Sequence, residues 1–202
     1  MSEHVETSEQ KPIQNVRDSY IAKTLTESQC DLAVDVASII NRHIQKTGSF
    51  REALTDYAHA FARSEKFDAM KGEVIIRDVY TAQYGHTMNA AREALLENEK
   101  NLPETAREHA LQAARKTLDK ISQGETEPFY KAYDREGSML ARTLNITESG
   151  AKQLMVENYR AIEGRELYET GKELEEQHHK PKLDEARQER AKARSQTVVR
   201  RS

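Results

Sequence analysis

Helix-breaking residues are scarce in this chain: its 202 residues include only 8 glycines and 4 prolines. Between them, alanine, glutamate, lysine, arginine, glutamine and leucine dominate, and these residues lose little side-chain freedom in a helix. Runs in which Val, Ile or Thr alternate with polar residues, the pattern of a half-buried strand, are absent. The sequence therefore predicts an all-α fold, a bundle of six to seven amphipathic helices joined by short loops.

Local signals mark where the first helices begin and end. Thr26 followed by Gln29 forms a capping box, and Gly48 is typical of a helix stop. Ser49 with Glu52 repeats the capping pattern and predicts the start of a second helix.

The apolar pattern over residues 49–84 is helical throughout, with Ser64 as a possible break. The sequence allows either one long helix or two across this stretch. Gly85 is the expected stop, and Thr87 is expected to cap the next segment, which ends near Asn101.

Prolines mark two later helix starts. Pro103 and Pro128 each stand where a first-turn proline is favoured, because its missing N–H would have no partner there. A last long helix is predicted to begin at Thr147 and to continue past Tyr168. The chain is thus predicted to contain a disordered N-terminal segment over 1–18, a helical bundle domain over 19–180 and a basic C-terminal tail over 181–202.

The composition favours the cytoplasm. Charged residues make up 32% of the chain and the mean hydropathy is −0.86, and no run approaches the about 18 apolar residues of a spanning helix. The opening residues MSEHVETSEQK contain no apolar core like that of a secretory signal. Cys30 is the only cysteine, which excludes an internal disulfide and suits a reducing cytosol. We expect a cytoplasmic protein with no membrane insertion.

Charge is distributed unevenly along the chain. Residues 186–202 carry a net charge of +5, whereas the preceding 185 residues carry about −8. The tail has almost nothing apolar to bury, so it is expected to be coil or nascent helix in isolation. It is predicted to dock on a protein partner with an acidic surface, or to make salt-sensitive, sequence-blind contacts with nucleic acid. Its cations are Arg187, Arg190, Lys192, Arg194, Arg200 and Arg201.

The segment Met139–Leu154, MLARTLNITESGAKQL, has the spacing of a helix-turn-helix and resembles the units of bacterial regulators over some sixteen residues. Asn145 would adopt the left-handed conformation of the turn, Ile146 would plug the turn, and Thr147 would cap the second helix. The positions where the helices should face each other are small or apolar: Leu140, Ala141, Leu144, Ala151 and Leu154. The pattern predicts a steep two-helix corner at Asn145.

Two interpretations of this corner are open. As a DNA-reading unit it would use Arg142, Ser149, Lys152 and Gln153. As a corner within a bundle it would only hold helices together. The second interpretation is favoured, because Glu148 and Glu157 oppose a single lysine on the second helix, and DNA affinity depends mainly on Lys and Arg contacts to phosphate.

No arrangement of residues indicates catalysis. Glu175 and His178 have the Glu-x-x-His spacing of di-iron bundles, as do Glu176 and His179, but such a site needs this motif on two helices plus Glu from two more. A glycine-rich phosphate loop is absent from the sequence. We therefore expect a non-enzymatic protein without a metal or cofactor.

The Arg-rich ending, QERAKARSQTVVRRS, resembles the translocation signals of substrates of bacterial type IV secretion systems, which also serve plasmid conjugation. Residues 138–181 are similar to helical accessory regions found beside conjugation genes in alphaproteobacteria. The resemblance implies an accessory or recruited factor in a bacterial cytoplasm, itself translocated in one version of this role. The tyrosine and histidine-triad signature of a conjugative relaxase is absent, so the resemblance implies no nicking activity.

Overall fold

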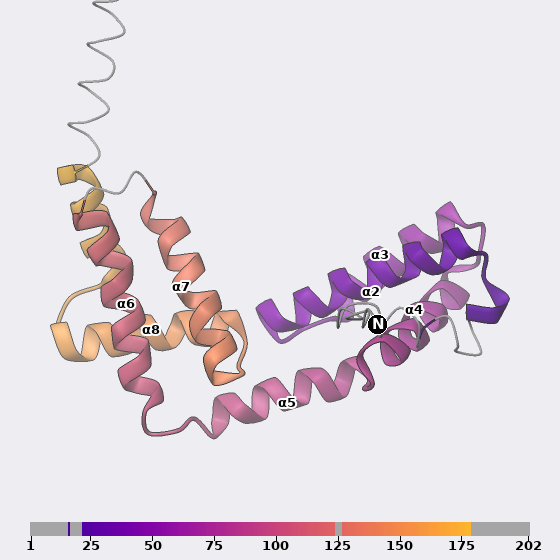
Figure 1. Cartoon of the computed structure of the whole chain (residues 1–202), viewed down its shortest axis with the longest axis horizontal. Coiled ribbons are helices and arrows are strands. Elements are labelled where there is room, and N and C mark those ends of the chain that lie inside the picture. The colour runs from indigo at the N-terminus through magenta and orange to yellow at the C-terminus, as the bar shows by residue number, and fades with distance from the viewer. Residues whose placement is uncertain (1–15, 17–21, 124–126, 179–202) are drawn as a thin grey trace, which may run out of the picture. The chain divides into compact units, whose positions relative to one another are not determined.

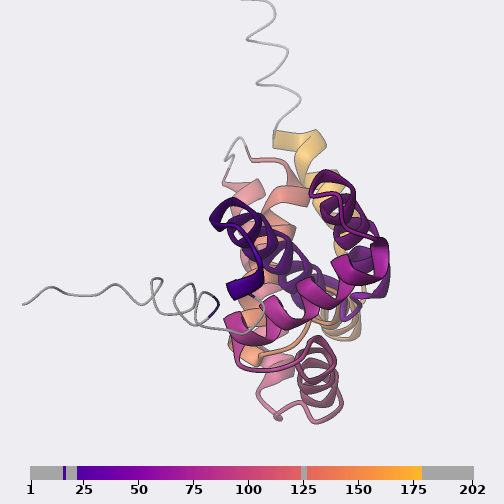
Figure 2. The ribbon, with the colours of Figure 1, turned by 90° about the vertical axis from the view of Figure 1, so that its right-hand side faces the viewer.

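The computed structural model describes Val16 and residues 22–123 and 127–178. These residues form helices joined by short connections, with no strand among them, as Figures 1 and 2 show. The all-α prediction is confirmed. The chain divides into two compact units, whereas the sequence prediction treated 19–180 as one bundle. Unit 1 extends to Asn101 and includes Asn145–Thr147, and unit 2 extends from Leu102 to Leu144 and resumes at Glu148.

Unit 1 contains a short 3-10 helix and four α-helices. They are η1 (Ala22–Thr24), α2 (Glu27–Thr47), α3 (Arg51–Ser64), α4 (Ala69–Tyr84) and α5 (Met88–Lys100). The stretch 49–84 is therefore two helices. Lys66, between α3 and α4, has a φ of 60°, a left-handed conformation that a continuous helix does not contain.

Most of the predicted helix ends in unit 1 are confirmed. The Thr26 side chain accepts a hydrogen bond from the N–H of Gln29, and the capping box is complete. Gly48 and Gly85 end α2 and α4 in the left-handed conformation, with φ of 67° and 74°. The side chain of Thr87 accepts a hydrogen bond at the start of α5.

The capping box predicted at Ser49 is wrong. α3 begins at Arg51 with Phe50 at its N-cap, and no side chain caps it. The N–H of Ser49 instead donates to Oγ1 of Thr47 at 3.2 Å. Phe50 is 5% exposed, so burial of its ring positions the start of α3 in place of a cap.

The core of unit 1 lies where α2, α3 and α4 pack together. Ile40 and Ile44 of α2 and Ile76 of α4 are fully buried there. Val16 is also fully buried in this core, although it belongs to the segment 1–18 that was predicted to be disordered. The other residues of that segment lie outside the described part of the chain.

α3 and α4 approach each other closely at Gly72. A Cβ atom added there would lie 2.7 Å from Cβ of Ala62 and 2.8 Å from the backbone oxygen of Ala58. Glycine therefore sets the distance between the two helices, a role that no local pattern in the sequence indicates.

Unit 2 contains α6 (Ala106–Ser122), α7 (Phe129–Leu144), α8 (Glu148–Glu163) and a C-terminal helix described over 167–178. α6, α7 and α8 each pack against the other two, and Figure 1 shows α8 crossing α6 and α7. α7 begins directly after Pro128 as predicted, whereas α6 begins three residues after Pro103.

The long helix predicted from Thr147 past Tyr168 is wrong. Gly164 has a φ of 67°, and its N–H donates to the carbonyl of Arg160 at 3.0 Å, which ends α8. A separate helix follows from Leu167. This break, together with the split of 49–84, gives eight α-helices in the described residues, where six or seven were predicted.

Candidate functional site

The predicted corner between α7 and α8 is present. α7 ends at Leu144, α8 begins at Glu148, and Asn145 between them has a φ of 51°. Ile146, which was predicted to plug the turn, is buried, with 4% of its surface exposed. Figure 1 shows that α8 runs steeply across α7. The sequence therefore predicted this local geometry correctly.

The inward-facing residues of the corner are largely as predicted. Leu140, Ala141 and Ala151 are buried, while Leu144 and Leu154 are half-buried. Met155, which the pattern did not single out, is fully buried one residue further along α8.

The turn itself is held by two residues of α5 that the sequence did not indicate. The turn residues Asn145–Thr147 group with unit 1. Within this unit, Nδ2 of Asn98 donates to the carbonyl of Asn145 at 2.8 Å. The carboxylate of Glu99 accepts from both the N–H and the hydroxyl of Thr147, the residue directly before α8.

Lys152, the central residue of the proposed DNA-reading face, folds back onto α7. Its ammonium group donates to Asp134 at 2.6 Å and lies 5.8 Å from the centre of the Tyr133 ring. Its methylene groups lie against Gly137, where an added Cβ would be 2.7 Å from Cγ of Lys152. The lysine is therefore engaged within unit 2.

The other predicted DNA contacts are exposed. Arg142 and Ser149 are exposed. Gln153 is exposed as well, and its amide donates to Glu157 at 2.8 Å. Arg160, the second cation of α8, pairs with Glu166. Both cations of α8 therefore already have carboxylate partners.

The six tail cations lie outside the described residues, but the helix that precedes the tail is firmly packed. Leu167 is fully buried. The ring of Tyr168 lies 5.7 Å from that of Phe129 and 5.1 Å from that of Tyr133. The carboxylate of Glu175 accepts from the N–H of Phe129 at the start of α7. The helix over 167–178 is thus part of the folded unit 2.

Tyr133 connects this helix with α8. Its hydroxyl donates to the carbonyl of Lys152 at 3.0 Å. Burial raises the pKa of Tyr133 well above the ordinary value of tyrosine, and the hydrogen bond with Tyr168 raises it further. The hydroxyl therefore stays protonated and acts as a structural donor.

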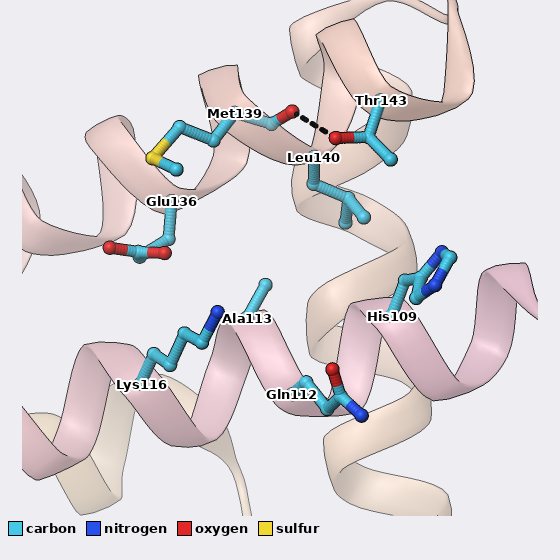
Figure 3. A pocket seen from close by; sticks show the side chains of 8 residues that line it. All are labelled: His109, Gln112, Ala113, Lys116, Glu136, Met139, Leu140 and Thr143. Atoms are coloured by element: carbon cyan, nitrogen blue, oxygen red, sulfur yellow. Dashed lines mark hydrogen bonds between the residues drawn. The ribbon is translucent and has the colours of Figure 1, made fainter.

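A groove runs between α6 and α7 in unit 2, with a volume of about 130 Å³. Figure 3 shows its lining, in which Lys116 of α6 points toward α7. Ala113 and Leu140 are buried, whereas Met139 is 54% exposed. The lining residues are His109, Gln112, Ala113 and Lys116 of α6 and Glu136, Met139, Leu140 and Thr143 of α7.

Unit 1 has a larger groove of about 590 Å³ between α2 and α5. Ile44 and Leu95 contribute apolar surface, and Asn41 and Gln45 contribute amides. The described residues that line this groove include no Asp, Glu, Lys or Arg, and His86 is their one titratable nitrogen.

The described residues contain no group of three or more His, Cys, Asp or Glu side chains that could hold a metal ion. Glu175, from the Glu-x-x-His pattern, bonds to the backbone of Phe129, and His179 lies outside the described residues. None of the described helices is long and apolar enough to cross a membrane.

Comparison with protein-family models, with curated proteins and with solved structures gives no match for this chain.

Proposed function

We propose that this chain is a non-enzymatic helical interaction protein, an accessory or recruited factor in plasmid conjugation or type IV secretion. The Arg-rich tail would be its docking or translocation signal. The observation that carries the proposal is the separation of charge, with +5 in residues 186–202 and about −8 in the rest of the chain.

The packing of the helix over 167–178 supports this role for the tail. Leu167, Tyr168 and Glu175 hold that helix within unit 2, so the described part of the chain ends in a folded helix on the N-terminal side of the tail. Arginine suits docking on an acidic partner, because its guanidinium binds carboxylates in a bidentate manner. The resemblance of the ending to translocation signals supports the same role.

A transfer assay tests this proposal. Donor cells carrying the full chain are compared with cells carrying a chain that lacks residues 186–202, and with cells in which the five tail arginines are changed to Gln. Transfer is expected to fall at least tenfold in both, and to fall less when the same arginines are changed to Lys, which keeps the charge.

Equal thermal unfolding of all variants is the control for folding. If transfer is unchanged when the five arginines become Gln, the tail is not the docking element.

A second candidate function is DNA binding through the α7–α8 corner, which the left-handed Asn145 and the steep crossing favour. The structure predicts that Asp134→Asn strengthens duplex binding, because it releases Lys152 from its ion pair. Changing Ser149 and Gln153 to Ala should weaken the preference between duplex sequences. Affinities are measured by mobility shift at two salt concentrations, since phosphate contacts make binding fall with salt. A protein that shifts no duplex at low salt does not have this function.

A further inference from the structure

The α6–α7 groove of unit 2 combines an apolar floor with two charged side chains, Lys116 and Glu136. Among the described residues that line it, the only carboxylate is that of Glu136, which is 5% exposed. Lys120 pairs with this carboxylate at 3.1 Å, and Nε of Arg135 lies 3.6 Å from it. Arg135 pairs more closely with Glu127, at 2.6 Å, so Lys120 is the cation that neutralises Glu136. Lys116 also lines the groove and has no carboxylate partner among the described residues, which leaves one positive charge there.

Two exposed cations remain available to a partner: Lys116, which lines the groove, and Arg142, which lies on α7 outside the lining. Lys116 and Arg142 form no ion pair with any residue that the structure describes. Arg142 lies three residues after Met139, and residues at this spacing are neighbours on a helix surface. Met139 therefore stands between Lys116 across the groove and Arg142 on its own helix.

The size of the groove limits what it can accept. About 130 Å³ is well below the roughly 300–1,000 Å³ of a typical small-molecule pocket, and suits one inserted apolar side chain. Exposed methionine is an adaptable contact for such a side chain.

The exposed apolar surface of the groove favours a peptide over nucleic acid as its occupant. Two free cations would displace few counterions from a duplex, and a duplex offers no apolar side chain to cover Met139. Charge and apolar surface together therefore match an acidic peptide.

We propose that the α6–α7 groove binds an acidic peptide segment of a protein partner. One apolar side chain of the peptide packs on Ala113, Met139 and Leu140, and its carboxylates pair with Lys116 and Arg142. Recognition would depend on one apolar anchor residue and on the negative charges around it. The site lies within the folded unit 2 and goes beyond the docking role proposed for the tail.

Methyl NMR of the full chain tests the proposal directly. The chain has five methionines, so labelling their methyl groups with 13C gives a simple spectrum in which Met139 is assigned through Met139→Leu. The probe is a 15-residue peptide of Ala and Glu with one central Leu. Its addition is expected to shift the Met139 methyl signal saturably, while the signal of Met70, exposed in unit 1, stays unchanged.

Matched variants distinguish peptide binding in the groove from nonspecific attraction between the peptide and the charged surface. Lys116→Glu and Met139→Asp are each expected to raise the Kd for the peptide at least tenfold. Lys131→Glu repeats the lysine change, and Tyr130→Asp introduces the same acidic residue in place of another large exposed side chain, both on α7 outside the groove. Both should leave the Kd within twofold. Replacing the central Leu of the peptide with Ala should also weaken binding at least tenfold.

Four results would overturn the proposal. The first is no shift of Met139 at millimolar peptide, and the second is an equal shift of Met70. The third is a shift that disappears when residues 186–202 are deleted, which would place peptide binding in the tail. The fourth is a Met139 shift caused by a DNA duplex, or by raising the protein concentration alone, which would make the occupant nucleic acid or a second copy of the chain.

Discussion

Gly72→Ala is expected to lower the free energy of unfolding of unit 1 by about 2 kcal/mol, because the new methyl group cannot be accommodated between α3 and α4. The Cβ would lie 2.8 Å from the backbone oxygen of Ala58, which cannot rotate away. Alanine gains about 1 kcal/mol of helix propensity, but separating the two helices costs more. Thermal unfolding should show a fall on the order of 10 °C in the Tm of unit 1.

Hydrogen exchange can show whether the loss of stability is confined to unit 1. Faster exchange is expected in α3 and α4 and unchanged exchange in α6, α7 and α8. Asp78→Ala is the matched control, since it places the same alanine in the same helix at an exposed position. An unchanged Tm for Gly72→Ala would mean that α3 and α4 do not pack as closely as the structure shows.

Gly171→Ala is expected to detach the C-terminal helix from α7. A Cβ at this position would overlap the ring of Phe129, which is 5% exposed and stacked 5.8 Å from the ring of Tyr133. The ring has little room to move, so an overpacking cost of about 2 kcal/mol is expected. Hydrogen exchange should accelerate over 167–178 and at the start of α7, where Glu175 accepts from the N–H of Phe129.

A double variant tests whether the cost of Gly171→Ala comes from the clash between the new methyl group and the Phe129 ring. Phe129→Leu removes much of the ring, so Gly171→Ala should cost clearly less in that background, and the difference measures the coupling of the two positions. Lys172→Ala is the control on the exposed face of the same helix. Equal costs in both backgrounds would show that the ring is not the obstacle. The Gly171→Ala variant can also be put through the transfer assay. A fall in transfer would show that the proposed docking role of the tail depends on the packing of the helix over 167–178.

The helix ends show which structural features can be predicted from residues close together in the sequence. Thr26, Thr87, Gly48 and Gly85 were all predicted correctly, because capping bonds join residues three or four apart and a left-handed stop needs only a glycine. Ser49 failed as a cap because the burial of Phe50, a tertiary effect, positions the start of α3.

The α7–α8 corner also combines features that local sequence predicts with a contact that only tertiary packing creates. The left-handed turn at Asn145 and the buried Ile146 follow from residue type and spacing, so the geometry was predictable. The partner of Lys152 was not, because Asp134 is 18 residues away and meets it only once α7 and α8 have packed. That ion pair removes a central cation from the face on which the DNA-binding interpretation depended.

The sequence by itself determined the all-α class, most helix ends, the turn at Asn145 and the separation of charge between the tail and the rest of the chain. Each of these depends on composition or on neighbours within about one helical turn. Only the tertiary structure decided the two units, the close approaches at Gly72 and Gly171, and the α6–α7 groove. These depend on which helix faces meet, and contacts between residues far apart in sequence settle that.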